Sequence, residues 1–349
     1  MSKAAIEKKI KPLTIAIGLV IFFVAYLLFI AILIYGFNVS NKLTRKTARI
    51  IPYPAASWGT TYITEDKLKS QLDSARMFYE NQDFSDLGMR VDFATEDGKK
   101  RLKIKEKNVL NKLIENQLIE NEAKKRGIVI NPEDISQAVS RKMQEYGSEE
   151  YLRNNLTRLY GWTIADFEEN IVKPDMYKEK LFADIQENDK TRTEAKKKIN
   201  LALEELNAKK DFSAVAEKYS EGESAKSKGE LGWFGKSEML PEIAVTIFNL
   251  KKGERSKVIE SSLGFHIILV EDKKTEDGAD KAQLKQVFVR ANNFADWLDM
   301  HVKSFDINIF SKDMYWNKTD GQVDFENTDL KNFENNLETN SPGDISVLF

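Results

Sequence analysis

The stretch from Gly229 to Ile268, "GELGWFGKSEMLPEIAVTIFNLKKGERSKVIESSLGFHII", decides the fold of the middle of the chain. Its glycines, Gly229, Gly232 and Gly235, permit positive φ or a close backbone approach around a short strand. They do not predict a nucleotide-binding loop, because no strand, glycine-rich turn and long helix follow in that order. The stretch predicts a strand over 231–234, a helix after Pro241, a turn at Lys252-Gly253, and strands near 256–260 and 265–271.

The amino-acid composition argues against several classes of function. The 349 residues include 53 basic and 55 acidic side chains, and this balance argues against a nucleic-acid-binding surface of phosphate contacts. Cysteine is absent, which removes disulfides, thiolate nucleophiles and thiolate metal ligands. The two histidines, His266 and His301, are too few for a histidine-rich metal site. We therefore expect no nucleic-acid partner, no metal and no cofactor.

The N-terminal segment "PLTIAIGLVIFFVAYLLFIAILIYGF" is uncharged from Leu13 to Phe37. About 20 apolar residues are enough to cross a hydrocarbon core of roughly 30 Å. The apolar region of a cleavable signal peptide has about 7 to 15 residues, so this one is too long. We predict a transmembrane anchor over 13–37.

The charges that flank this segment bear on its orientation. The basic tail over 1–12 favours a cytoplasmic N-terminus, although the basic residues that follow the segment weaken the argument. We predict a single-pass protein of the cell membrane with an extracytoplasmic body. The basic residues are Lys3, Lys8, Lys9 and Lys11 before the segment, and Lys42, Arg45, Lys46 and Arg49 after it.

A helical module is predicted over 60–188, after a proline-containing linker over 38–59 that leads into a short strand or turn. The longest helix places four apolar residues on one buried stripe, and Gly127 is suited to end it. The residues of the stripe are Leu110, Leu113, Ile114 and Leu118.

Another helix is predicted to begin at Pro132. Gly147 followed by Ser148, and Gly161 followed by Thr163, are stop and start signals that predict helices over 149–160 and 164–172.

Two segments of this module, "VLNKLIENQLIENEAKKRGIVINPEDI" and "GWTIADFEENIV", resemble the N-terminal chaperone domain of the SurA and PpiD type of periplasmic foldase. The resemblance covers roughly 100 residues. It implies an all-α chaperone module that binds unfolded chains. A generic bundle of capped amphipathic helices remains the alternative.

The segment "DFSAVAEKYSEGESAKSKGELGWFGKSEMLPEIAVTIFNLKKGERSKVIESSLGFHIILVED" resembles the parvulin-type peptidyl-prolyl isomerase domain over about 60 residues. The resemblance implies an α+β chain in which a small antiparallel sheet flanked by helices follows the helical module. It also implies that Leu231, Met239 and Ile243 line a proline pocket with Phe234 nearby. Ordinary core packing is the alternative reading of these four side chains.

The family's opening strand, which carries a histidine, is missing from its usual place. The later segment "KAQLKQVFVRA" resembles that strand, with Gln286 at the histidine's position. A circular permutation would supply the strand from downstream, because the two ends of a compact domain often lie close together. We therefore predict a permuted parvulin-like domain over 189–310, to which "FADWLDMHVKSFDINIF" adds a helix and an edge strand. An accidental strand in a linker is the alternative.

The resemblance also implies the polar site. His266 corresponds to the family's histidine on the last strand, and Ser261 to the hydroxyl residue before the turn. Gln286 would stand beside His266, and glutamine can both donate and accept a hydrogen bond. Gly222 stands where the family has cysteine or aspartate. Gln286 and Gly222 therefore predict reduced activity.

Two functions remain open at this point. The first is a membrane-anchored foldase that isomerises X-Pro bonds in exported polypeptides. The second is a weak or inactive parvulin-like holdase that binds unfolded exported chains. The acidic, asparagine-rich tail over 311–349 is expected to be disordered.

Overall fold

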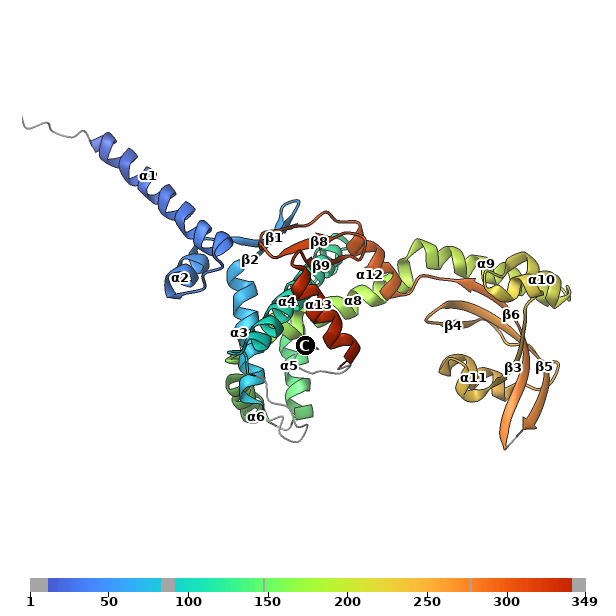
Figure 1. Cartoon of the computed structure of the whole chain (residues 1–349). Coiled ribbons are helices and arrows are strands. Elements are labelled where there is room, and N and C mark those ends of the chain that lie inside the picture. Colours follow the sequence, from blue (N-terminus) through green and yellow to red (C-terminus); the bar gives the residue numbers. More distant parts are fainter. Residues whose placement is uncertain (1–11, 83–91, 147, 277, 341–349) are drawn as a thin grey trace, which may run out of the picture. The chain divides into compact units, whose positions relative to one another are not determined.

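The computed structural model describes residues 12–82, 92–146, 148–276 and 278–340 (Figure 1). These residues form two compact units. Unit 1 contains the chain up to Met176 and again from Val302, and unit 2 runs from Tyr177 to His301. Unit 2 is thus an insertion in the sequence of unit 1.

The N-terminal helix of unit 1 is long and apolar enough to cross a membrane. The span Ile15–Gly36 has a mean hydropathy of 3.1. A second helix follows within the segment predicted to be a linker, and the side chain of Asn41 caps it by accepting hydrogen bonds from two backbone N–H groups. The elements are α1 (Pro12–Ala31), the π-helical turn η1 (Ile32–Gly36) and α2 (Lys42–Ile50).

Two small antiparallel sheets accompany the helices of unit 1. The sequence predicted a short strand or turn after the linker and an edge strand within 294–310, but it did not predict the hairpin over 314–325. In the first, β1 lies between β2 and β7, and Ala56 pairs with both Ile63 and Ile309. The edge strand that we expected within the parvulin-like domain therefore belongs to unit 1. The strands are β1 (Pro54–Trp58), β2 (Thr61–Thr64), β7 (Asn308–Ile309), and the hairpin β8 (Met314–Asn317) and β9 (Gln322–Phe325).

The long helix α4 (Glu96–Lys125) carries the predicted buried stripe, and each of its four apolar residues is at most 9% exposed. The expectation of a disordered tail is wrong for residues 311–340. The side chain of Asn111 accepts a hydrogen bond from the backbone N–H of Val323 at 2.6 Å and donates one to its carbonyl at 3.3 Å. Val323 and Phe325 are buried in the same cluster as the stripe. The rest of the predicted tail, 341–349, lies outside the described residues.

The helices predicted to begin at Pro132, after Ser148 and after Thr163 begin at these signals. Ser148 and Thr163 cap their helices, and Gly161 adopts a φ of 67° between them. The stop signal at Gly147 lies outside the described residues. Further helical elements of unit 1 are α3 (Glu65–Asn81), α5 (Pro132–Tyr146), α6 (Glu149–Asn155), η3 (Leu156–Tyr160), α7 (Ile164–Phe167), η4 (Glu168–Val172) and α13 (Thr328–Asn340), with α8 (Lys173–Asn188) running into unit 2.

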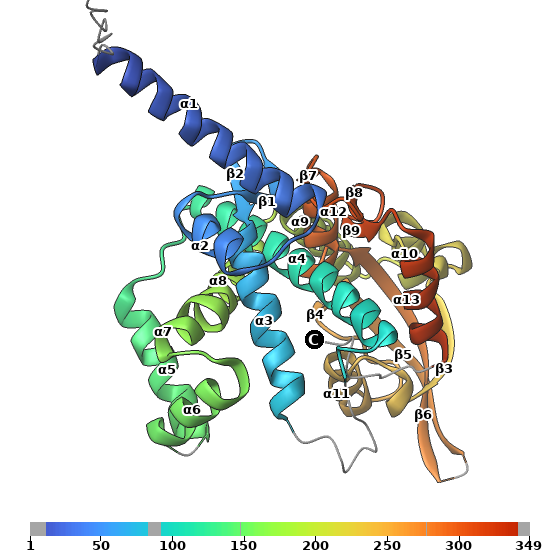
Figure 2. The same cartoon turned by 60° about the vertical axis from the view of Figure 1, so that its left-hand side comes forward.

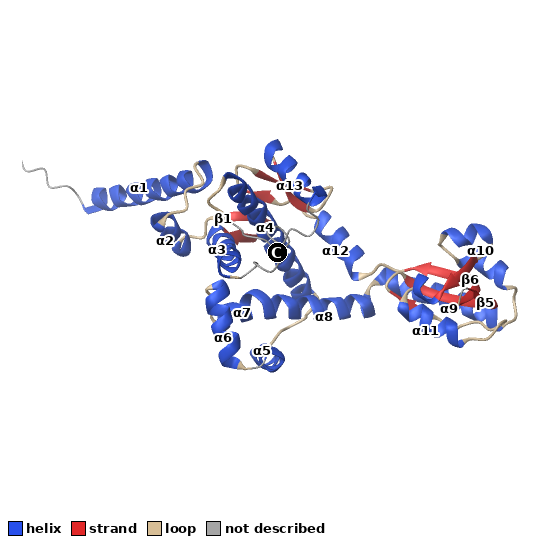
Figure 3. Cartoon of the chain, turned by 60° about the horizontal axis from the view of Figure 1, so that its bottom comes forward, coloured by secondary structure: helices blue, strands red, loops and turns tan. Residues whose placement is uncertain are grey.

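Unit 2 is built on a four-stranded antiparallel sheet with the order β3–β6–β5–β4. Helices α9 and α10 pack on one face of the sheet and α11 packs on the other (Figure 1). The strands of this sheet are red in Figure 3. The elements are α9 (Lys190–Asn207), α10 (Phe212–Tyr219), η5 (Glu223–Ser227), β3 (Glu230–Gly235), η6 (Lys236–Glu238), α11 (Pro241–Asn249), β4 (Ile259–Ser261), β5 (Gly264–Glu276), β6 (Ala279–Arg290) and α12 (Phe294–Lys303), which ends in unit 1.

Candidate active site

The alternation of side chains along β5 places His266 on the face of the sheet that α11 covers. Phe265 and Ile267 are buried in the cluster with α9 and α10, whereas Ile268 is buried in the cluster with α11. Because successive side chains of a strand point to opposite faces, His266 shares the face of Ile268. Gln286 on β6 is the register partner of Ile268. The predicted pairing of 284–289 with the strand of His266 is therefore confirmed.

A chain of hydrogen bonds joins four polar side chains at this place. His266 Nε2 lies 2.7 Å from Ser261 Oγ, and His266 Nδ1 lies 3.5 Å from Gln286 Oε1. Gln286 Nε2 donates to Ser224 Oγ at 3.1 Å. Because an amide oxygen only accepts, this arrangement favours the tautomer in which Nδ1 carries the proton and Nε2 accepts from Ser261. The chain fixes the orientation of the imidazole.

Burial controls the charge of His266. Its side chain stacks on Phe288 with ring centroids 4.8 Å apart, and the residue is only 4% exposed. Burial lowers the pKa of His266, and the hydrogen bond with Gln286 opposes this effect without cancelling it. The imidazole is thus held in its neutral form at neutral pH.

The lowered pKa of His266 gives a pH dependence of known sign. In the unfolded chain a histidine titrates near its ordinary pKa of about 6.5, so below that pH the unfolded state binds the proton more readily. We expect the stability that comes from neutral His266 to be complete above about pH 6.5 and to fall as the pH drops through the folded-state pKa. NMR titration of the imidazole should give a midpoint below 6.5, and a midpoint above that value would contradict the buried, neutral assignment.

The four apolar residues predicted to form a pocket come together in one cluster. Ile243, in the first turn of α11, is buried with Ile268 of β5. Leu231 and Phe234 on β3, and Met239 after η6, are partly buried against the same cluster. This apolar set lies on the same face of the sheet as His266 and Gln286.

Sequence reasoning missed Ser224. It lies in η5, is 7% exposed, and accepts the hydrogen bond from Gln286. No local signal in the polar loop distinguished it from the neighbouring serines. Gly222 lies beside it, where a Cβ would meet Phe288 Cδ1 at 3.2 Å and Gln286 Nε2 at 3.8 Å. A larger residue at this position would press on the glutamine and on the ring that stacks on the histidine.

Within the described ranges, no group of three or more histidine, aspartate or glutamate side chains is placed to hold a metal ion. The arrangement offers instead an apolar surface beside an ordered, uncharged imidazole. Such a surface can hold a proline ring and stabilise a distorted amide without a nucleophile or a charged acid.

Two known protein families match parts of the chain. Residues 181–272 match the PPIC-type PPIase domain, and residues 6–182 match the SurA-like N-terminal domain. The match to the SurA-like N-terminal domain covers just over half of the chain, so the chain belongs to the family that has this domain. In this chain a PPIC-type domain follows it.

Its curated relatives include foldase proteins named PrsA. The protein from Caldanaerobacter subterraneus is 26% identical over 58% of this chain and 66% of its own length. The protein from Halalkalibacterium halodurans is 45% identical over 21% of this chain and 22% of its own length. The protein from Geobacillus kaustophilus is 28% identical over 60% of this chain and 79% of its own length. The chain thus spans less than two thirds of the first two relatives.

Among solved structures, PrsA from Bacillus subtilis is 20% identical and aligns over 56% of this chain and 72% of its own. The TM-score of this alignment is 0.20.

Proposed function

We propose that the protein is a membrane-anchored foldase that catalyses cis-trans isomerisation of X-Pro bonds in exported polypeptides. The observation that carries the proposal is the placement of Ser261, His266 and Gln286 on the sheet face that also holds the apolar cluster under α11. The match of residues 181–272 to the PPIC-type domain supports it. The reduced activity predicted from Gln286 and Gly222 is part of the same proposal.

The proposed mechanism follows from the barrier to amide rotation. Rotation costs about 18–20 kcal/mol because amide resonance is lost, and X-Pro exchange without a catalyst takes tens to hundreds of seconds. A catalyst must bind the twisted amide more tightly than the planar one. In our proposal Leu231, Phe234, Met239 and Ile243 hold the proline ring. The hydrogen-bonded side chains of Ser261, His266 and Gln286 provide an uncharged polar surface beside the proline ring.

The chain order of the proposed isomerase domain supports a circular permutation. The strand β6 lies between β3 and β5 in the sheet, although it follows both in the chain. The match to the PPIC-type domain ends at residue 272, before β6 begins at Ala279. In our proposal β6 takes the place of the family's opening strand.

We propose an orientation with a cytoplasmic N-terminus and an extracytoplasmic body. The span Ile15–Gly36 and the basic residues that precede it support this orientation. Protease added to intact cells would digest the body in this orientation, and would leave it intact in the reverse one.

The test of catalysis is Met239→Ala in the full-length chain, with isomerisation of an X-Pro peptide as the readout. The truncation opens the apolar cluster where the proline ring would pack, so we expect kcat/KM to fall about tenfold, equivalent to about 1.4 kcal/mol of lost transition-state binding. Met300→Ala is the matched control, because Met300 lies in the same unit and is 52% exposed. It should leave kcat/KM unchanged.

Folding of each variant is checked first by circular dichroism. A folded Met239→Ala protein with the wild-type rate would refute the proposed pocket. A wild-type rate equal to that of buffer would refute the enzyme.

A holdase is the second candidate function, and a cleft in unit 1 favours it. The cleft has a volume of about 200 Å³ and lies between α3, α4 and the segment from Glu169 to Asp175. Apolar side chains line it together with amide and charged groups, a mixture suited to unfolded chain segments. A folded protein that suppresses aggregation of an unfolded client without any isomerisation would establish this function in place of the first. The apolar lining residues include Val109, Leu113, Ile171 and Pro174.

A further inference from the structure

The short helix α2 folds back beside the last turns of α1 (Figure 2). Tyr26 Oη and Thr47 Oγ1 are 2.8 Å apart, and Tyr53 Oη donates to the carbonyl of Leu27 at 2.9 Å. Ala48 of α2 is buried in one cluster with Ile34. Helix α2 is therefore attached to the part of α1 that precedes its end, and not only to the residues after it.

The position of this attachment along α1 sets the depth of α2. A helix rises about 1.5 Å per residue, so about 20 residues of the longer uncharged segment are enough to span a hydrocarbon core of roughly 30 Å. When the core begins at Leu13, directly after the basic tail, the span ends near Ile32. Tyr26 lies about 9 Å before that end by the same rise. This is the depth at which interfacial helices lie, since their apolar faces are buried about 5–10 Å into the boundary between headgroups and acyl chains.

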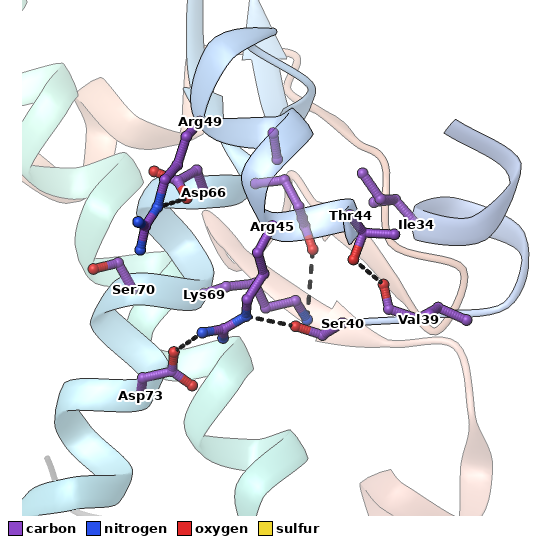
Figure 4. A pocket seen from close by; sticks show the side chains of 12 residues that line it. Ile34, Val39, Ser40, Thr44, Arg45, Arg49, Asp66, Lys69, Ser70 and Asp73 are labelled. Carbon is purple, nitrogen blue, oxygen red and sulfur yellow. Dashed lines mark hydrogen bonds and ion pairs between the residues drawn. The ribbon is translucent and has the colours of Figure 1, made fainter. Parts of the chain in front are cut away.

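One side of α2 faces helix α3 of the same unit. Arg45 pairs with Asp73 of α3, and Arg49 lies 3.6 Å from Asp66 of the same helix (Figure 4). These ion pairs orient α2 about its own axis.

A different side of α2 is apolar and exposed. Leu43 is 48% exposed and Ile50 is 72% exposed, and the two lie seven residues apart on one stripe. At about 100° per residue, this stripe is about 130° around the helix from the two arginines. Leu43 and Ile50 therefore point away from α3.

Two lysines lie between the apolar stripe and the arginines. Lys42 and Lys46 are exposed, and among the described residues no hydrogen bond or ion pair is found for either one. Their long stems allow the ammonium groups to reach outward while the neighbouring apolar side chains are buried. This order of apolar and basic side chains is typical of helices that bind anionic membrane surfaces.

We propose that α2 is an interfacial helix that lies in the surface of the same bilayer that α1 spans. Leu43 and Ile50 insert at the boundary of the acyl chains, and Lys42 and Lys46 bind the phosphates of anionic lipids. The proposal rests on the proposed anchoring by α1. Helix α2 then holds α3 near the membrane surface, because Arg45 and Arg49 form ion pairs with α3.

The absence of cysteine from the chain provides a clean test. Single cysteines replace Leu43 or Ile50 in the full-length chain, and each is labelled with a polarity-sensitive fluorophore in nanodiscs whose lipids carry nitroxide quenchers. Leu19→Cys reports the span of α1, and Tyr151→Cys, on the exposed surface of α6, reports the body. We expect lipid quenching at 19, 43 and 50 and none at 151.

The anionic-lipid part is tested by adding Lys42→Gln and Lys46→Gln to the Leu43→Cys protein. In nanodiscs with anionic lipid, we expect these changes to reduce quenching at 43 at least twofold. In purely zwitterionic nanodiscs they should change it little, because the attraction is to net negative charge. Equal quenching in both lipids, with and without the lysines, would overturn the role of anionic phosphate.

The remaining outcomes separate this proposal from the anchor. Quenching at 19 without quenching at 43 and 50 would overturn the interfacial helix and leave the anchor intact. No quenching at 19 would overturn the anchor and, with it, the interfacial helix. Disulfide cross-linking between two Leu43→Cys chains, without lipid quenching, would overturn the proposal in favour of a second copy of the chain.

Discussion

Replacing Gly264 with alanine should unfold unit 2 and abolish the isomerisation that we propose for it. Gly264 has a φ of +141°, and an added Cβ would lie 2.3 Å from the carbonyl oxygen of Val289 and 2.7 Å from the nitrogen of Ala291. Both atoms belong to the backbone that continues the pairing of β5 with β6, so neither can move away alone. Unfavourable φ costs about 1–3 kcal/mol and overpacking about 1–3 more, giving an expected loss of about 2–6 kcal/mol in the free energy of unfolding.

The matched control is Gly253→Ala. Gly253 also has a positive φ, +83°, but no heavy atom lies within 4 Å of the added Cβ. This substitution should cost only the free energy of the unfavourable backbone conformation, about 1–3 kcal/mol, and leave the proposed isomerase activity of the folded fraction unchanged. Denaturant unfolding followed by circular dichroism measures both variants. Equal losses of unfolding free energy in the two variants would show that the close backbone approach at Gly264 does not contribute to the cost of the substitution.

The second large effect is expected for Phe325→Ala. Phe325 is 2% exposed and belongs to the core cluster that includes Leu110 and Val323. Removing a buried phenylalanine side chain costs about 3–5 kcal/mol, because the transfer free energy is lost and a cavity remains. We expect unit 1 to unfold at a lower denaturant concentration, while unit 2 retains its proposed isomerase activity.

Tyr151→Ala serves as its control, since Tyr151 is an aromatic residue of the same unit that is 59% exposed. Exposed substitutions usually change stability by no more than about 0.5 kcal/mol. If Phe325→Ala unfolds like the control, the segment after Ser311 does not contribute to the core of unit 1.

Local signals predicted much of the fold. The strand over 231–234 and the helix after Pro241 correspond to β3 and α11, and the caps at Ser148 and Thr163 start their helices as expected. Each of these features depends on residues only a few positions apart, such as a cap and the N–H groups of the first turn. Interactions between residues so close in the chain can be predicted from a single sequence.

The missed features depend on partners far apart in the chain. The tail reads as disordered because its apolar residues are sparse, but Val323 bonds to Asn111, 212 positions earlier. The edge strand expected within 294–310 does form, as β7, but the sequence did not predict its partner, because β1 lies far earlier in the chain. Ser224 looks like any serine in a polar loop until Gln286 donates to it.

Because unit 1 is made of two separate segments of the chain, its parts are synthesised at different times. The segment from Val302 onward, which completes the core around α4, is synthesised about 125 residues after Met176. At roughly 5–20 residues per second, this interval lasts about 6–25 s, during which the apolar stripe of α4 has no β9 to cover it. Unit 2 is complete before unit 1 can be. A ribosome that stops before residue 302 therefore yields a chain whose inserted unit can fold while the surrounding unit stays open, a species that quality-control proteases would recognise by its exposed core.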